Sequence, residues 1–314
     1  VTSPVFSQNK IPIERGLPNA KQLQKLKNTD RYAITEDGIS TRWIPGSSEA
    51  TYFANGDARR GTAWQLDSPE LDTRILPKKK PMIRDGEYGR ISLGKHNSIF
   101  IGGIAHELGH ALGLPHNKPR PDESVRGQPL MGAGNRTYSE EVRGEGRGSF
   151  LTLAHALRLA SHPQFSGSIK GLDQEPKCDI EDLSIRTKNN EIEVSGRIKA
   201  DPPVYAVVAY LDPKGNGDYN ATTATAIPDR EGHFRFSSPP FFRGKTGSLR
   251  IVQLHVNGRV ANRENRARFE YRFDVEKNGT INLASTQARL ELQPLVLALQ
   301  KNDRRLAKRQ SRKL

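Results

Sequence analysis

The segment that most constrains this chain runs from His106 to His116 and reads HELGHALGLPH. Because His106 and His110 are four residues apart, a helix would place both imidazoles on one face, about one turn from each other. Gly113 can adopt the left-handed conformation that ends a helix, and Pro115 cannot extend one. The sequence therefore predicts a helix that stops sharply and a turn that brings His116 back toward the other two histidines.

Three neutral imidazoles on one zinc ion leave one coordination position open, and an open position distinguishes a catalytic zinc from a structural one. Water fills that position, and zinc lowers its pKa to roughly 7. Glu107 follows the first ligand directly, so it can accept a proton from the water and later donate one to the leaving amine. A chance match at five specified positions has a probability on the order of one in ten thousand. We therefore expect one catalytic zinc on His106, His110 and His116, with Glu107 as the general base.

The motif resembles the long zinc-binding motif of the metzincin clan of zinc endopeptidases at all its specified positions, including Gly113. That family has a methionine in a tight turn beneath the metal, and Met131 in PLMGAG stands downstream of His116. The alternative for Met131 is an ordinary core methionine. The resemblance also implies that a helix over residues 150–160 closes the lower subdomain. It further implies that a strand within residues 89–100 lines the cleft and binds an extended peptide along its edge.

The sequence departs from the family pattern at several positions. Asn117 follows the third histidine and matches none of the subfamilies that this position distinguishes. Ala133 stands where some members have a tyrosine as an extra metal ligand, and Tyr138 lies further on. Tyr138 can stabilise the oxyanion only if a loop brings it back to the site. Cys178 lies after the catalytic region, in the wrong place for the inhibitory cysteine of some pro-segments, and we expect an inert thiol.

The chain divides by pattern into an α+β region over residues 1–170, an all-β region over 178–278 and a C-terminal segment over 283–314. The first region shows helical patterns at 17–28, 99–112 and 150–160, and extended patterns at 41–53 and 90–101. The second shows five to seven short alternating runs, typical of an antiparallel sandwich like immunoglobulin or fibronectin type III modules. The last predicts a helix that leads into a basic tail. The expected fold is thus a metzincin-like domain followed by a β-sandwich.

The composition limits the possible partners. No apolar run approaches the ~20 residues that span a bilayer, so we expect no membrane span. Of the net charge of +14, residues 301–314 contribute +6, which favours a solvated basic end and no nucleic-acid partner. One cysteine excludes an intrachain disulfide. The sequence begins at Val1 without a basic and apolar leader, which fits a secreted or extracytoplasmic protein whose signal peptide or pro-segment is removed or outside the sequence.

Weaker candidates lie outside the motif. Asp212, Asn216 and Asp218 have the oxygen ligands and spacing of a Ca²⁺ site, but the same residues build hairpin turns, which we favour. Three further histidines, His96, His155 and His162, are expected to be surface or packing residues. The sequence therefore predicts a zinc endopeptidase acting on proteins or peptides. Its alternatives are a narrow-specificity or self-processing peptidase, and a secreted zinc-containing binding or adhesion module without turnover.

Overall fold

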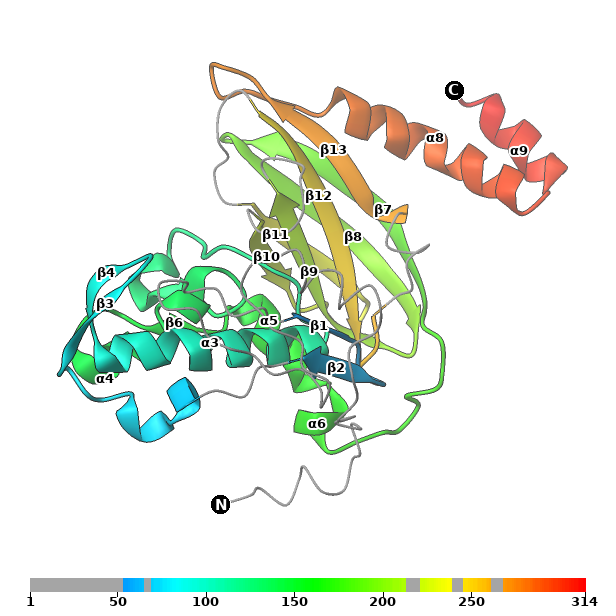
Figure 1. The fold of residues 1–314 in the computed structure, drawn as a ribbon. Helices are drawn as coiled ribbons and strands as arrows, with labels where there is room; N and C mark the ends of the chain where they lie inside the picture. Colours follow the sequence, from blue (N-terminus) through cyan, green and yellow to red (C-terminus); the bar gives the residue numbers. More distant parts are fainter. Residues whose placement is uncertain (1–52, 65–68, 213–220, 239–244, 261–267) are drawn as a thin grey trace, which may run out of the picture. The chain divides into compact units, whose positions relative to one another are not determined.

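The computed structural model describes residues 53–64, 69–212, 221–238, 245–260 and 268–314 (Figure 1). The chain forms two compact units, Val1–Asp173 with Asn257–Arg259, and Gln174–Val256 with Val260–Leu314. The expected helix at 17–28 and most of the expected strand at 41–53 lie outside the described residues.

Helix α3 (Leu93–Ala111) is the central element of the first unit. It begins at Ser92, whose hydroxyl accepts a hydrogen bond from the Lys95 amide at 3.0 Å. Glycines weaken a helix by about 1 kcal/mol each relative to alanine, but here they permit close packing. A Cβ added at Gly102 would lie 2.1 Å from the Asn135 carbonyl oxygen. The helix predicted over 99–112 is confirmed, and it begins well before that range.

Two antiparallel hairpins flank this helix at opposite ends. Strands β3 (Met82–Asp85) and β4 (Gly89–Ser92) lead directly into its first turn. Strands β1 (Phe53–Gly56) and β2 (Gly61–Trp64) contact its last turn, because a Cβ added at Gly56 would lie 1.7 Å from the Ala111 carbonyl oxygen. The strand predicted over 90–101 is wrong beyond Ser92. The Ser92 cap starts a helix there, and the apolar run that follows does not by itself distinguish strand from helix.

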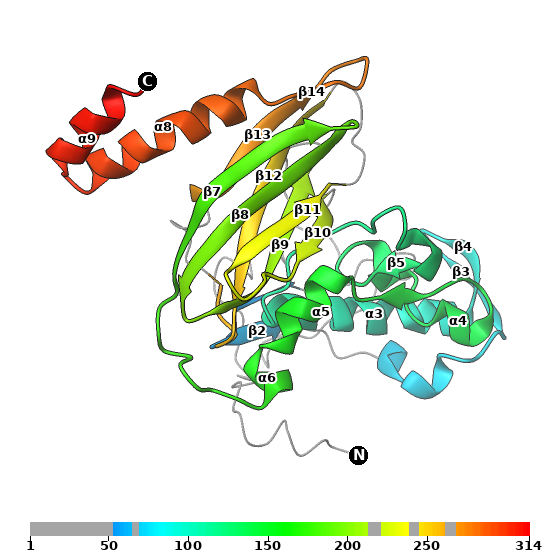
Figure 2. The same cartoon turned by 180° about the vertical axis from the view of Figure 1, so that it is seen from behind.

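The rest of the first unit consists of short elements (Figure 2). They are η1 (Pro69–Leu71), η2 (Thr73–Ile75), η3 (Ser124–Arg126), β5 (Gln128–Pro129), η4 (Ala133–Arg136), α4 (Glu140–Arg143), β6 (Ser149–Phe150), α5 (Leu153–Ala160) and α6 (Pro163–Ser166). Strands β5 and β6 pair in parallel, and α5 follows β6 after a short link. Helix α5 therefore begins at Leu153, three residues after the start of the predicted range of 150–160. It buries Ala154, His155 and Leu159 on one face.

The second unit contains two antiparallel sheets that share one hydrophobic core. One sheet has the order β11-β8-β7 and the other β10-β9-β12-β13-β14. Their bounds are β7 (Lys177–Lys188), β8 (Glu191–Asp201), β9 (Val204–Asp212), β10 (Thr222–Ala226), β11 (His233–Ser237), β12 (Lys245–His255), β13 (Glu270–Val275) and β14 (Ile281–Asn282). The core takes Ile185, Val194 and Phe236 from one sheet and Leu211, Ile251 and Phe273 from the other. The sheets form a sandwich, as the alternating pattern predicted.

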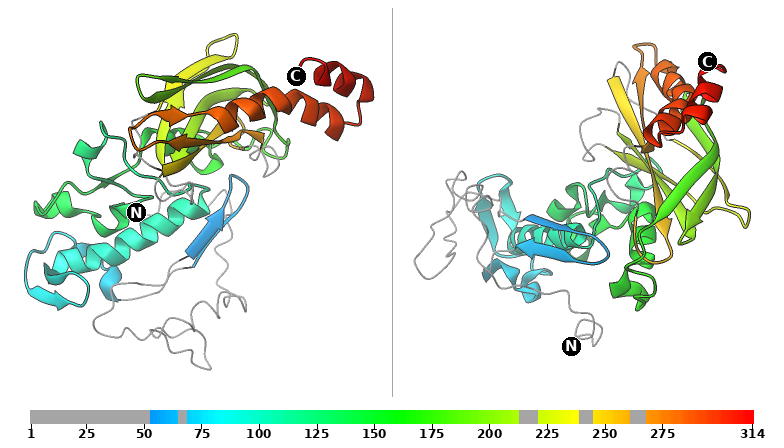
Figure 3. Two further views of the ribbon diagram at one scale, coloured as in Figure 1. Left: turned by 90° about the horizontal axis from the view of Figure 1, so that it is seen from above. Right: turned by 90° about the vertical axis from the view of Figure 1, so that its right-hand side faces the viewer.

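Two helices end the chain, α8 (Ala284–Gln300) and α9 (Arg304–Ser311) (Figure 3). The side chain of Gln287 donates to the Ile185 carbonyl at 2.8 Å, which joins α8 to the sandwich. The expected solvated basic end is helical, because Asp303 caps α9 and Ala307 is buried while the cationic side chains stay exposed. Among the described residues, no helix has both the length and the apolar character needed to cross a bilayer.

Candidate metal centre

Three histidine side chains meet at the C-terminal end of α3. His106 and His110 project from the helix, and His116 projects from the loop that follows. Their Nε2 atoms form a triangle, 3.1 Å from His106 to His110, 3.0 Å from His110 to His116 and 3.2 Å from His106 to His116. Three nitrogens at 2.0–2.1 Å from a tetrahedral zinc lie about 3.3 Å apart. The triangle therefore has close to the size that one zinc ion requires.

The hydrogen bonds of the first two histidines set their tautomers. Nδ1 of His106 lies 2.7 Å from the Leu130 carbonyl oxygen, and Nδ1 of His110 lies 2.8 Å from that of Leu114. Because a carbonyl oxygen only accepts, each Nδ1 carries a proton and donates it. The Nε2 lone pairs of both rings then point to the shared centre, the arrangement that carbonyl partners impose on metal-ligating histidines.

Burial disfavours a charge on these rings. It lowers the pKa of His106 to about 4 and that of His116 to about 3, and it lowers the pKa of His110 as well. The neighbouring histidines add to the effect at His106 and His116. The imidazoles are therefore neutral near pH 7, and their converging lone pairs repel one another unless a cation lies between them. A set of three neutral imidazoles suits zinc, so this cluster fits the metal that the sequence predicts.

Gly113 and Met131 lie where they can shape this centre. Gly113 has a φ of +81°, the left-handed conformation that its position after the helix requires. Met131 is fully buried in a small core with Leu114 and Leu159. A Cβ added at Gly109, next to the second ligand, would lie 2.3 Å from the Met131 sulfur. Met131 is therefore buried directly against the helix that carries the first two histidines, and its role beneath a metal stays a prediction.

Glu107 lies on α3, and Tyr138 lies beside it. Glu107 follows His106 on α3 and is half-buried. Tyr138 is also half-buried, and its Cβ lies 2.8 Å from the position that a Cβ on Gly102 would take. Gly102 precedes His106 by one helical turn on the same face. The structure thus places Tyr138 beside α3 one turn before the first ligand, and its role at an oxyanion stays a prediction.

The strand that the resemblance implied for the cleft lies at the wrong end of the helix. Strand β4 ends at Ser92, and a helix from Leu93 to His106 advances about 20 Å. The β1–β2 hairpin is the one beside the metal end, where a Cβ on Gly113 would lie 3.3 Å from the Gly56 carbonyl oxygen. In the segment FANGDARRGTAW, Gly, Asp and a second Gly stand between two short apolar runs, a turn signal that could have identified the hairpin. Residues 57–60 form its loop, in which the Asp57 carboxylate accepts the Arg59 amide at 2.7 Å.

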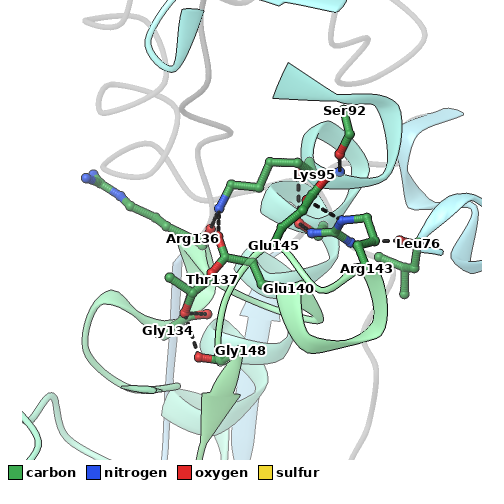
Figure 4. Close-up of polar contacts among 11 residues, drawn as sticks. Leu76, Ser92, Lys95, Gly134, Arg136, Thr137, Glu140, Arg143, Glu145 and Gly148 are labelled. Atoms are coloured by element: carbon green, nitrogen blue, oxygen red, sulfur yellow. Dashed lines mark hydrogen bonds and ion pairs between the residues drawn. The ribbon is translucent and has the colours of Figure 1, made fainter. Parts of the chain in front are cut away.

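Polar contacts tie the N-terminal half of α3 to the segment after Met131 (Figure 4). The ammonium of Lys95 bonds the carboxylate of Glu140. The fully buried guanidinium of Arg143 pairs with Glu145 at 2.6 Å and donates to the Leu76 carbonyl at 2.7 Å. The Lys95 bond, together with a bond from Arg143 to the Ser98 hydroxyl at 3.3 Å, holds the helix against the segment that follows Met131, well away from the histidines.

The remaining candidates are distributed over both units. Nδ1 of His96 lies 3.3 Å from an Asp85 carboxylate oxygen. The other two lone histidines, His155 and His162, are buried in the first unit.

Cys178 is buried in β7, and burial raises the pKa of its thiol to about 12, in line with an inert thiol. Asp212 is buried at the end of β9. The other two expected Ca²⁺ ligands, Asn216 and Asp218, lie outside the described residues.

A second group of side chains could geometrically hold a metal ion, Asp229, Glu231 and His233. All three are exposed. One Asp229 carboxylate oxygen accepts the backbone amides of Glu231 at 3.0 Å and His233 at 2.8 Å. This is the hydrogen bonding of an ordinary turn, and it gives the group a structural role.

The structure resembles solved structures of OgpA from Akkermansia muciniphila. The wild-type protein matches with a TM-score of 0.56 and 22% identity, over 81% of this chain and 71% of that one. A catalytically inactive form, in complex with an O-glycopeptide (glycodrosocin) substrate, matches with a TM-score of 0.56 and 20% identity, over 81% and 70%. No protein-family model matches the sequence, and no curated protein does. At this identity the likeness shows a shared fold.

Proposed function

We propose that this protein is a zinc-dependent endopeptidase of the metzincin type. The observation that carries the proposal is the convergence of three Nε2 atoms, 3.0–3.2 Å apart, with two of the rings held by carbonyl oxygens. His106, His110 and His116 would hold the ion. When bound, zinc supplies Lewis acidity that activates water and polarises a carbonyl group.

The chain's own residues supply the proton transfers. Glu107 adjoins the first ligand on α3, and we assign it the proton of the attacking water and its later delivery to the leaving amine. A carboxylate in this role typically contributes 10²–10⁴-fold to the rate. A zinc site that served only structure would need neither an open coordination position nor a base beside it.

We propose a polypeptide substrate that binds in extended form beside the β1–β2 hairpin. Strand edges bind peptides through main-chain hydrogen bonds, and this hairpin adjoins the last turn of α3. The likeness in fold to a protein crystallised with an O-glycopeptide substrate makes O-glycopeptides the first class to test. We further propose that the enzyme acts outside the cytoplasm and that an immunoglobulin- or fibronectin-like sandwich positions it or its substrate.

The test combines metal content with cleavage. The wild-type chain, the chelated chain, Glu107→Gln and a control, the exposed Glu276→Gln, would be assayed by metal analysis and by mass spectrometry of casein and glycodrosocin digests. We expect about one zinc per chain in both variants, and cleavage that is lost on chelation and falls at least about 100-fold in Glu107→Gln.

The other outcomes separate the alternatives. Cleavage of the glycopeptide but not of casein would indicate a narrow-specificity peptidase, and cleavage of this chain alone a self-processing one. Bound zinc without any cleavage would favour a binding or adhesion module. A chain that binds no metal would refute the proposal.

A further inference from the structure

The loop that follows α3 carries the third histidine. Hydrogen bonds to the helix fix only the first residues of this loop. The last helical bonds run from the Gly113 amide to the His110 carbonyl and from the Leu114 amide to the Gly109 carbonyl, both at 2.9 Å. Pro115 has no amide hydrogen to donate. The position of the third ring therefore depends on contacts from outside the helix, unlike the first two rings, which sit on it.

Helix α5 contacts this loop at both of its ends. Nη2 of Arg158 donates to the Gly113 carbonyl at 2.7 Å, where the loop begins. Nδ2 of Asn117 donates to the Thr152 hydroxyl oxygen at 2.8 Å, where the loop ends. Thr152 is the N-cap residue of α5 and Arg158 lies in its last turn, so the two bonds are about 9 Å apart along the helix axis.

Burial and the nearby end of α3 strengthen these two hydrogen bonds. Asn117 and Thr152 are both fully buried, so no solvent replaces their bond when one partner is removed. The backbone amide of Asn117 also donates to the Met131 carbonyl at 3.2 Å, which joins the same residue to the segment around Met131. The cation of Arg158 lies just beyond the C-terminal end of α3, where the helix dipole favours a positive charge.

We propose that Asn117 and Arg158 are positioning residues through which α5 holds His116 in the metal triangle. Asn117 is the residue that departs from the subfamily patterns, and its bond to Thr152 gives it this role. The inference rests on the proposed function, because it assumes that the triangle binds a metal. It requires no statement about the substrate, so zinc binding tests it even in a chain that cleaves nothing.

The experiment measures metal binding in the full chain. Zinc affinity would be obtained by competition with a chelating dye, and the absorption spectrum of the Co²⁺-substituted protein would report the coordination geometry. The variants are Arg158→Ala, Asn117→Ala and Thr152→Val, with Arg158→Lys and Thr152→Ser as conservative replacements that keep a donor or a hydroxyl. Arg90→Ala removes an exposed arginine on β4, at the opposite end of α3 from the histidines, and serves as the matched control.

We expect each of the three disruptive variants to weaken zinc binding about 10–100-fold, the range seen when hydrogen-bond partners around metal ligands are removed. The Co²⁺ spectrum should change with them, and both conservative replacements and the control should stay near wild type. A role limited to folding would lower the thermal stability of the metal-free chain and leave the affinity and spectrum of folded variants unchanged. That result would overturn the proposal.

If the alanine variants fail to fold, two comparisons between side chains of similar size still test the proposal. Thr152→Val against the wild type, and Arg158→Met against Arg158→Lys, each remove one hydrogen bond with little change in volume. Equal zinc affinity within each pair would refute the proposal that Asn117 and Arg158 position His116. A wild-type chain that binds zinc without cleaving any substrate would instead count against the proposed function alone.

Discussion

Gly109 lies between the first two histidines in sequence and faces Met131, which makes the pair a direct test of the packing beneath the site. The proposed perturbation is Gly109→Ala, alone and combined with Met131→Ala. An added Cβ would lie 2.3 Å from the Met131 sulfur and 3.0 Å from its Cε. Optimal separations between such atoms are about 3.5–4.0 Å, so the methionine would have to move within a core in which it is fully buried.

Two opposing effects set the magnitude. Replacing glycine by alanine inside a helix stabilises it by about 1 kcal/mol, whereas overpacking a core costs about 1–3 kcal/mol. Gly109→Ala should therefore destabilise the first unit by up to about 2 kcal/mol. Met131→Ala should cost about 2–5 kcal/mol through the cavity it leaves. In that background the clash is gone, so Gly109→Ala should change sign and stabilise by about 1 kcal/mol.

Calorimetry of the full chain would measure both backgrounds, with the transition that shifts on chelation assigned to the first unit. A change of 1 kcal/mol corresponds to about 2–4 °C for a unit of this size. Gly102→Ala is the matched control, because its obstacle is the backbone oxygen of Asn135 at 2.1 Å, which Met131→Ala does not remove. Additive effects of the Gly109 and Met131 substitutions, or stabilisation by Gly109→Ala alone, would refute the assigned packing.

Three further predictions concern titration and charge. Burial lowers the pKa of His155 to about 3. Between that pH and about 6.5, this histidine binds a proton only in the unfolded chain. The free energy of unfolding therefore falls on acidification by up to about 1.4 kcal/mol per pH unit. Thermal midpoints of the metal-free chain between pH 6.5 and 5 should therefore fall more steeply in wild type than in His155→Phe. The thiol of Cys178 has a pKa of about 12, against an ordinary value of 9.0. At pH 8 it should therefore react with a disulfide reagent about 10³-fold more slowly in the native state than in urea, as followed by absorbance. Arg143→Leu should destabilise the first unit by about 3 kcal/mol in calorimetry, because it leaves Glu145 and the Leu76 carbonyl without their partner.

Much of the candidate site could be predicted from the sequence because its information is local. The four-residue spacing of His106 and His110 fixes their common face, and Gly113 specifies the left-handed turn that the structure contains. The alternating runs of the second unit likewise specified strands with one face in a shared core. Each of these features is set by a backbone period or by one residue's allowed conformations.

Local pattern was ambiguous where an apolar run suits both a strand and a helix. The range 90–101 reads as extended, yet the hydroxyl of Ser92 caps a helix that continues through it. The basic C-terminal segment reads as solvated charge, yet Asp303 caps α9 and buried Ala307 holds one face. In both places a cap together with packing outweighs the composition of the segment.

What the sequence by itself determined is the chemistry of the centre: three imidazoles, a neighbouring carboxylate and the turn that lets them converge. Only the tertiary structure decided which hairpin adjoins the metal end and which side chains hold the third ligand. The bonds of Asn117 to Thr152 and of Arg158 to Gly113 join residues 35 and 45 positions apart. No period in the sequence encodes such pairs, because they arise when separate elements pack and each buried polar group must find a partner.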